Sequence, residues 1–185
     1  MFYRISNKLI QLSKGWVVLI SALIFIVFMI FVLPAQAAKS DAETNNASSP
    51  DTSFFYTTDD LYQMAEAYGE MGRAAYIRAR FTFDIIWPLV YTLFLTAFTG
   101  WAAAKVFIPG SPWRMLNLIP IFGMLLDYLE NISAATVMAR FPLRTPVVDF
   151  LTPVFTLLKW VFVYASFVVP IGLIIIFLIK TIKKR

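Results

Sequence analysis

The sequence predicts an all-α, polytopic membrane protein, in which four transmembrane helices form a bundle and an additional amphipathic helix lies outside the cytoplasm. Three observations support this fold class. Of the 185 residues, 59% are hydrophobic, whereas a soluble domain of this length is nearer half apolar. The excess is gathered into long apolar runs, and about 20 such residues span a bilayer as a helix. Aromatic residues make up 17% of the chain, which suits lipid-facing and interfacial positions.

The first apolar run extends from Val17 to Leu33 and is long enough to span a bilayer with little tilt. We expect the helix to end at Pro34. Two interpretations of residues 1–36 stay open, a retained transmembrane anchor and a signal peptide cleaved after the Ala-Gln-Ala sequence at 35–37. We favour the anchor, because a signal peptide has an apolar run of only about 7–15 residues. Both interpretations put the chain from residue 38 onward outside the cytoplasm.

Residues 37–57 are predicted to form a polar extracytoplasmic linker. The part from Ala37 to Ser53 is rich in small and polar residues and has no periodicity, so we expect it to be disordered. The chain is thus divided into three regions, 1–36, 37–57 and 58–185. The third is predicted to contain the amphipathic helix and a three-helix membrane bundle.

The amphipathic helix is predicted to begin at Thr58, which is a good N-cap residue. The next two residues are aspartates, which suit the positive end of the helix dipole. The segment from Leu61 to Phe81 then alternates in charge at helical spacing and is too polar to span a membrane. We expect a solvated connecting helix that lies along the outer surface or extends directly into the second span.

Three further spans follow, and Pro88 is expected to kink the first of them. Loops rich in proline at 108–114 and 141–149 separate them. The predicted spans are Thr82 to Val106, Met115 to Ala139 and Phe150 to Ile179.

The distribution of basic residues predicts the orientation. One side of this four-helix arrangement receives nine basic residues and no acidic residue, and the other side receives six basic residues together with the acidic ones. The positive-inside rule therefore places both termini and the loop at 108–114 in the cytoplasm. The predicted location is the cell membrane, with both termini cytoplasmic unless the first helix is cleaved as a signal peptide. The nine basic residues are Arg4, Lys8, Lys14, Lys105, Arg114, Lys180, Lys183, Lys184 and Arg185.

Ionisable residues inside the predicted spans indicate a candidate site. The stretch MLLDYLENIS puts Asp127, Glu130 and Asn131 in the third span. Because one charge at the bilayer centre costs about 2.5–3.5 kcal/mol, we expect such side chains to face the bundle interior and to form an acidic pocket there. The predicted ligand-binding residues are Asp84, Tyr91, Asp127, Glu130, Asn131, Thr156 and Lys159.

Several functions are compatible with this pocket. The first hypothesis is binding of a lipid or small hydrophobic ligand whose cationic or hydroxyl-bearing headgroup meets Asp127 and Glu130. An alternative is a structural or accessory subunit that binds another membrane protein, and a second alternative is a membrane enzyme that uses paired carboxylates. A purely structural role also stays open, with Lys159 joining helices and Asp84 binding Arg80 four residues earlier.

The composition excludes several other classes of site. The chain has no cysteine and no histidine, so it has no disulfide, no thiol chemistry and no ordinary zinc site. It has no glycine-rich phosphate loop. We therefore expect no cofactor, no metal and no nucleic acid. The expected partners are the lipid bilayer, a lipid or hydrophobic small molecule, and a membrane protein.

Two segments carry a resemblance to known proteins. FDIIWPLVY, Phe83 to Tyr91, and LLDYLEN, Leu125 to Asn131, resemble segments of small, uncharacterised four-helix integral membrane proteins of bacteria. The resemblance implies a multi-pass membrane protein and no activity. In architecture alone, the chain is similar to four-helix proteins of the sterol-isomerase type, which enclose acidic residues in a lipid-accessible cavity.

Overall fold

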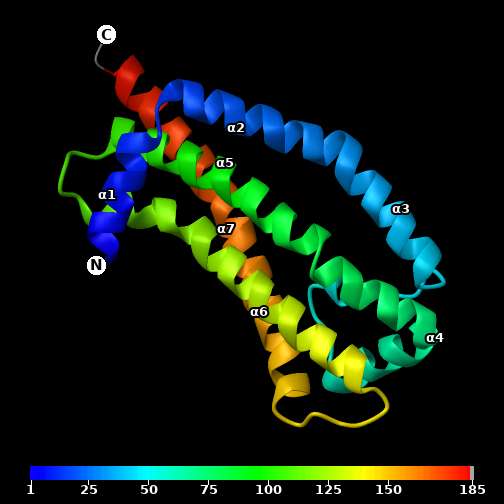
Figure 1. Ribbon diagram of the computed structural model, residues 1–185. Helices are drawn as coiled ribbons and strands as arrows, with labels where there is room; N and C mark the ends of the chain where they lie inside the picture. Colours follow the sequence, from blue (N-terminus) through cyan, green and yellow to red (C-terminus); the bar gives the residue numbers. More distant parts are fainter. Residues whose placement is uncertain (184–185) are drawn as a thin grey trace. The chain divides into compact units, whose positions relative to one another are not determined.

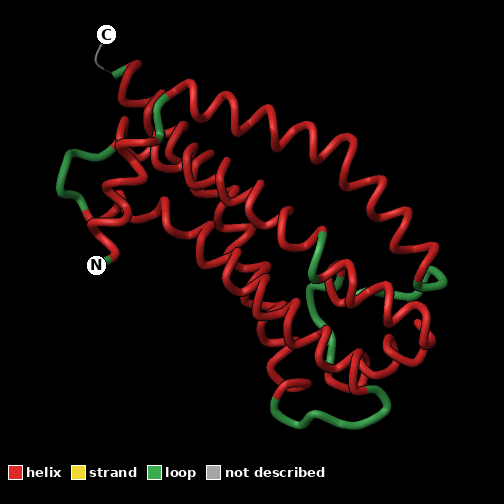
Figure 2. Tube along the Cα trace, in the orientation of Figure 1, coloured by secondary structure: helices red, strands yellow, loops and turns green. Residues whose placement is uncertain are grey.

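The computed structural model describes residues 1–183 (Figure 1). Within these residues all regular secondary structure is helical, as Figure 2 shows. The α-helices are α1 (Phe2–Leu12), α2 (Gly15–Val27), α3 (Leu33–Glu43), α4 (Thr58–Arg80), α5 (Phe83–Val106), α6 (Ile119–Arg140) and α7 (Val148–Ile182), and shorter helical segments are η1 (Phe28–Val32), η2 (Pro50–Thr52) and η3 (Pro112–Leu118).

The chain forms two compact units, and each is built from segments that are far apart in the sequence. The first unit contains Met1–Ile26, Leu89–Gly123 and the described residues from Val161 onward. The second unit contains Val27–Pro88 and Met124–Trp160. Each unit is described separately below.

Four helical stretches of the described chain are long and apolar enough to span a membrane. The last three predicted spans coincide with α5, α6 and α7, and their ends differ by at most four residues. The chain therefore has the composition and helix lengths of a multi-pass membrane protein, while the side that each loop faces stays a prediction. The four stretches are Gly15–Glu43, Thr58–Val106, Pro112–Arg140 and Val148–Ile182.

The first stretch differs from the sequence prediction, because the helix does not end at Pro34. It passes through the π-helical segment η1 into α3, which ends at Glu43. Pro34 lies in the first turn of α3. A proline ring clashes with the carbonyl four residues earlier in a regular α-helix, and the wider π-helical turn before Pro34 relieves that clash.

The expectation of a disordered linker is also wrong. Residues 37–43 are helical, and residues 44–57 form a loop that is part of the second unit and contributes Tyr56 to its core. Asn45 and Asn46 turn the chain with positive φ angles of 57° and 55°, a conformation that asparagine tolerates better than most residues. The loop is held by the hydroxyl of Tyr68, which donates a hydrogen bond to the carbonyl of Ser48 at 3.0 Å.

Helix α4 is not a solvated connecting helix, because one of its faces is buried. Its N-cap is Thr57 rather than Thr58, and Thr57 forms a reciprocal capping box with Asp60. Helical geometry breaks at Gly69, where φ is 63° and ψ is −178°. The core of the second unit is formed by Tyr56, Leu61, Tyr62, Met64, Ala65, Tyr68 and Tyr76 together with Ala134, Val137 and Met138 of α6.

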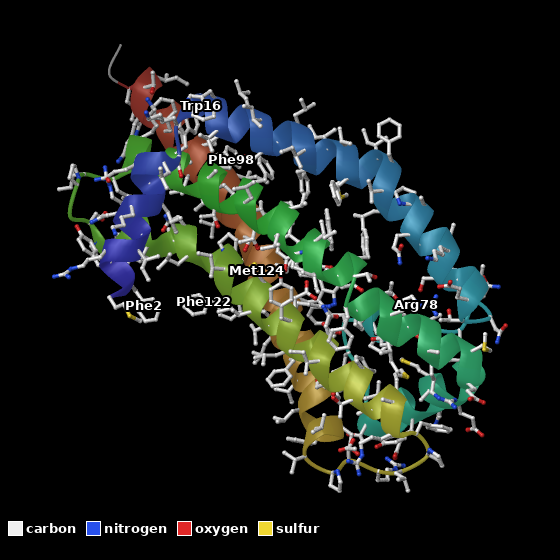
Figure 3. The ribbon with its side chains drawn as sticks, in the orientation of Figure 1. Phe2, Trp16, Arg78, Phe98, Phe122 and Met124 are labelled. Atoms are coloured by element: carbon white, nitrogen blue, oxygen red, sulfur yellow. The ribbon has the colours of Figure 1, made fainter. Side chains whose placement is uncertain are left out.

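The first unit contains a helix that the sequence analysis missed. Helix α1 packs against η3, where the Ser6 hydroxyl donates to Asn117 Oδ1 at 2.7 Å and Asn117 Nδ2 donates to the Ser6 carbonyl at 3.2 Å. The rings of Phe2 and Phe122 lie 6.1 Å apart, and Figure 3 labels both. The basic residues before the first span predict the topology, but those within α1 also form the polar face of this amphipathic helix.

Candidate functional site

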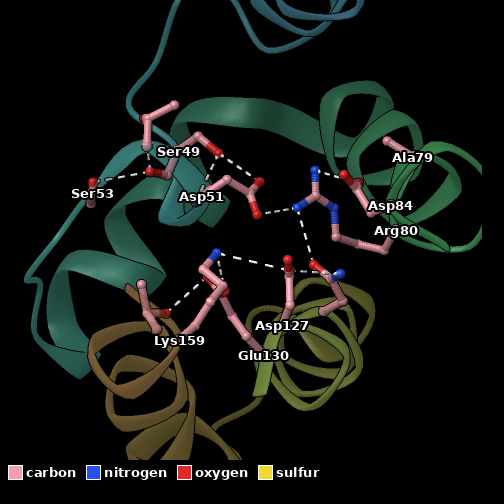
Figure 4. A network of polar contacts seen from close by, with 12 residues as sticks. Ser49, Asp51, Ser53, Ala79, Arg80, Asp84, Asp127, Glu130 and Lys159 are labelled. Atoms are coloured by element: carbon pink, nitrogen blue, oxygen red, sulfur yellow. Dashed lines mark hydrogen bonds and ion pairs between the residues drawn. The ribbon is translucent and has the colours of Figure 1, made fainter. Parts of the chain in front are cut away.

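The second unit contains a cluster of buried and partly buried polar side chains, which we call the acidic cluster (Figure 4). They come from the loop at 44–57 and from four helices, α4 to α7. All of them lie within the second unit. The cluster consists of Asp51, Tyr56, Arg80, Asp84, Asp127, Glu130, Asn131, Thr156 and Lys159.

One half of the cluster is organised by Arg80, the last residue of α4. Its guanidinium forms salt bridges with Asp51 and with Asp84, whose Oδ2 lies 2.9 Å from Nη2. It also donates to Asn131 Oδ1 at 3.3 Å and lies 4.3 Å from the centre of the Tyr76 ring. A planar guanidinium presents several donors at once, so one side chain can hold two carboxylates and an amide.

The other half is organised by Lys159 of α7. Its ammonium forms a salt bridge with Glu130 and lies 4.0 Å from Asp127 Oδ1. Glu130 is fully buried, and its Oε1 accepts a hydrogen bond from the Thr156 hydroxyl at 2.9 Å. Tyr56 shares a further hydrogen bond of 2.8 Å with Thr156. These contacts satisfy a carboxylate that would otherwise be costly to bury.

Asn131 connects the two halves. Its amide nitrogen donates to Asp127 Oδ1 at 3.3 Å, and its amide oxygen accepts from Arg80. Each half thus contains one cation between two carboxylates, and an amide that is both donor and acceptor bridges them. The tertiary structure explains why α6 carries Asp127, Glu130 and Asn131 within about one turn, since all three point into the same polar interior.

The charges of the cluster do not balance. Four carboxylates, namely Asp51, Asp84, Asp127 and Glu130, face two cations, and with every group ionised the cluster would carry a formal charge of −2. The surplus is confined to a region where water is scarce, so it favours a proton or an external cation.

The loop at 44–57 contributes two groups that lie outside the long apolar helices. Burial raises the pKa of the Asp51 carboxyl, but the positive charges of Arg80 and Lys159 outweigh it, so this pKa lies below its ordinary value. Burial and the negative charge of Glu130 raise the pKa of the Tyr56 hydroxyl well above its ordinary value. Asp51 is therefore an anion at neutral pH and Tyr56 is neutral.

The structure brings six of the seven predicted ligand-binding residues into this cluster. The seventh, Tyr91, belongs to the first unit, where its side chain is buried. A role in ligand binding stays a prediction for all seven. The six residues are Asp84, Asp127, Glu130, Asn131, Thr156 and Lys159.

Asp51 and Tyr56 belong to the cluster but are not among the residues predicted from the sequence. Both lie in the irregular segment at 44–57, where no periodicity assigns a residue to a face. Arg80 was expected to pair with Asp84 or, near the outer mouth of the pocket, to offset part of its negative charge, but it was not counted among the ligand-binding residues. A useful signal was its position at the end of α4, two residues before the next predicted span, which places a cation beside the acidic residues of the bundle.

The side chains of the cluster differ in their exposure. The Glu130 side chain is 0% exposed, whereas Asp51 is 26% exposed and Asp84 is 14% exposed. Two polar atoms nearby, Tyr76 Oη and Arg80 Nε, are buried without a hydrogen-bond partner. Among the residues that the structure describes, no group of three or more aspartate, glutamate, histidine or cysteine side chains is arranged to hold a metal ion.

A pocket elsewhere in the second unit is not lined by any of the predicted residues. It has a volume of about 450 Å³ and lies between α4 and the loop that joins α6 to α7. Arg144 and Asp59 form an exposed salt bridge of 2.8 Å there, and the Arg144 guanidinium lies 4.1 Å from the centre of the Tyr62 ring. The acidic cluster has the more unusual chemistry, because its charges are buried and this pair is exposed.

Comparisons of this chain with protein families, with curated proteins and with solved structures found no match. The fold and the cluster thus define a class, an all-α chain with four helices able to span a membrane and a buried acidic cluster in its second unit. The resemblance to small four-helix bacterial membrane proteins stays a prediction.

Proposed function

We propose that this chain is a multi-pass membrane protein whose acidic cluster binds the amine-bearing or hydroxyl-bearing headgroup of a lipid or of a small hydrophobic molecule. The observation that carries the proposal is the charge count, with four carboxylates and two cations in one largely buried network. A headgroup amine would supply the missing positive charge, and a hydroxyl would donate to a carboxylate oxygen.

The exposure of the cluster supports entry from the Asp51 and Asp84 side. Their side chains keep 26% and 14% exposure, and the fully buried Glu130 forms the closed end. The unpartnered Tyr76 hydroxyl supports the same proposal, since a buried hydroxyl normally has a partner and a ligand oxygen or nitrogen would provide one. The apolar tail would lie against the exposed apolar faces of the helices.

A purely structural role is the second candidate. It is favoured by the observation that each of the four carboxylates already has a cation within 4.0 Å. In that case Arg80 and Lys159 simply join the segments of the second unit, and the surplus charge is removed by protonation.

Native mass spectrometry of the full chain, purified in a mild detergent, distinguishes the two candidates. The test variant is Asp127→Asn/Glu130→Gln, which neutralises both carboxylates beside Lys159. The control variant is Glu66→Gln/Glu70→Gln, which removes two exposed carboxylates of α4 from the same unit.

Ligand binding predicts a discrete additional mass on the wild type and on the control, and loss of that mass from the test variant. The mass itself would name the class of ligand. A ligand-free mass in all three proteins, with the test variant only less stable, would reject ligand binding and favour the structural role.

A further inference from the structure

The first unit differs from the second in its charge. It contains no aspartate or glutamate, because all 11 acidic residues of the chain lie in the segments of the second unit. A basic side chain of the first unit therefore has no acidic side chain of its own unit to pair with. The basic residues within its described part are Arg4, Lys8, Lys14, Lys105, Arg114, Lys180 and Lys183.

Two of these basic residues converge on the C-terminal end of α5. Lys180 donates to the carbonyl of Val106 at 3.1 Å, and Arg114 donates to the carbonyl of Phe107 through Nε at 3.2 Å and Nη2 at 2.9 Å. The end of a helix carries about half a negative charge, so these bonds neutralise only a fraction of two full positive charges. The remaining charge needs counterions from outside the unit.

Helix α1 is fixed beside this positive region. The paired hydrogen bonds between Ser6 and Asn117 hold α1 on η3, and the Ser6 hydroxyl also donates to the carbonyl of Arg114 at 3.2 Å. Arg4 and Lys8 are exposed and lie one turn apart on the same helix. Their charges are thus presented on a helix whose position is fixed by the Ser6 contacts.

Large apolar and aromatic side chains of α1, of η3 and of the first turn of α2 are also exposed. Phe2 is 53% exposed, Leu12 67%, Trp16 62% and Trp113 62%. A helix that combines basic residues with exposed aromatic residues is typical of the membrane interface, where the rings enter the headgroup layer and the cations meet phosphates. Binding of nucleic acid would use only the basic side chains and would leave these apolar side chains in water.

We propose that α1, η3 and the first turn of α2 form a binding surface for anionic phospholipids. Arg4 and Lys8, with Arg114 beside them, would contact headgroup phosphates, and Phe2 and Trp16 would enter the interfacial layer. This surface is independent of the ligand proposed for the acidic cluster, since it lies in the other unit and takes a ligand of the opposite charge.

The test is a lipid titration of the full chain in neutral detergent, followed by native mass spectrometry. Phosphatidylglycerol is the anionic probe and phosphatidylcholine the zwitterionic reference. The wild type should bind phosphatidylglycerol more tightly. The variant Arg4→Gln/Lys8→Gln should lose roughly 25-fold in apparent affinity for phosphatidylglycerol, from roughly fivefold for each basic residue.

A matched control removes two exposed arginines from the second unit, as Arg78→Gln/Arg140→Gln, and should change the affinity by less than about twofold. The variant Arg4→Lys should bind like the wild type, because it keeps the charge. Equal binding of the two lipids by the wild type, or equal losses in both double variants, would overturn the proposal. If the Arg4 and Lys8 variant does not fold, the wild type alone decides, since its preference for phosphatidylglycerol should fall with rising ammonium acetate concentration.

Discussion

Arg80 and Asp84 are four residues apart in the sequence, yet they lie on two different helices and meet at 2.9 Å between Nη2 and Oδ2. Arg80 ends α4, and Asp84 lies in the first turn of α5. The pair closes the junction between these helices, and the same guanidinium also binds Asp51 of the preceding loop. One buried cation therefore fixes three segments of the second unit.

Replacing Arg80 should destabilise the protein strongly. Arg80→Gln leaves Asp51 and Asp84 without their cation in a buried setting, and breaking a buried ion pair in this way costs about 3–5 kcal/mol. The measurement is the free energy of unfolding in mixed detergent micelles, followed by tryptophan fluorescence. Arg78→Gln, two residues earlier and exposed, should change it by no more than about 0.5 kcal/mol. Similar values for the two variants would contradict the role given to Arg80.

The contribution of Asp51 to stability should depend on pH. Its pKa in the folded protein is lowered from the ordinary value of 3.8, so the charged form is favoured by folding. The stabilisation is fully present above the unfolded-state pKa and is lost as the pH falls through the lower folded-state pKa.

The difference in unfolding free energy between wild type and Asp51→Asn should therefore be large at pH 7 and shrink below about pH 4. The other carboxylates are present in both proteins, so their contributions to the pH dependence cancel in this difference. The exposed Glu66→Gln serves as the reference and should show little difference at either pH. A gap between wild type and Asp51→Asn that stays constant from pH 7 to pH 3 would mean that the carboxylate charge does not act as described.

Gly69 should tolerate no L-amino acid without strain. Its φ of 63° and ψ of −178° lie in a region that glycine alone occupies readily, and no neighbouring atom lies within 4 Å of where a Cβ would be. Gly69→Ala should therefore cost about 1–3 kcal/mol through backbone strain alone.

The control for Gly69 is Gly172→Ala. Gly172 is helical and also has open space around a Cβ, so alanine should stabilise α7 by up to about 1 kcal/mol. Thermal unfolding of both variants in the same detergent is the measurement. The two changes in melting temperature should have opposite signs. A higher melting temperature for Gly69→Ala would show that the fold does not need the helix break at this residue.

The orientation predicted from the basic residues can be tested directly, because the chain has no cysteine. Ile108→Cys and Leu143→Cys place single thiols in two loops, at side chains that are 78% and 64% exposed. In intact cells an impermeant maleimide should label Leu143→Cys, while Ile108→Cys should react only after the membrane is opened. The reverse pattern would invert the predicted topology.

Much of the helical architecture was predictable because it depends on local composition. The spans that became α5, α6 and α7 were located to within four residues at each end from apolar runs and proline-rich loops. The first span was predicted too short, because proline in general ends a helix. Here a π-helical turn accommodates Pro34, and the helix continues.

The candidate site was predictable only in part. Asp127, Glu130 and Asn131 share one face of a helix by spacing alone, and the cost of exposing charges to lipid turns that face inward. Their partners were harder to find. Nothing in the local pattern of the loop at 44–57 indicates that it packs against the bundle, so Asp51 and Tyr56 could not be assigned.

The sequence by itself determined the helical class, the number of long apolar helices and the polar residues that must avoid lipid. These properties follow from hydrophobic run length and helical periodicity, which are local. Only the tertiary structure decided that Arg80 joins Asp51 to Asp84, that Lys159 joins Asp127 to Glu130, and that Asn131 bridges the two groups. Such pairings depend on which segments pack together. No short stretch of the chain determines this packing, because the free energy of burying charges depends on contacts across the whole unit.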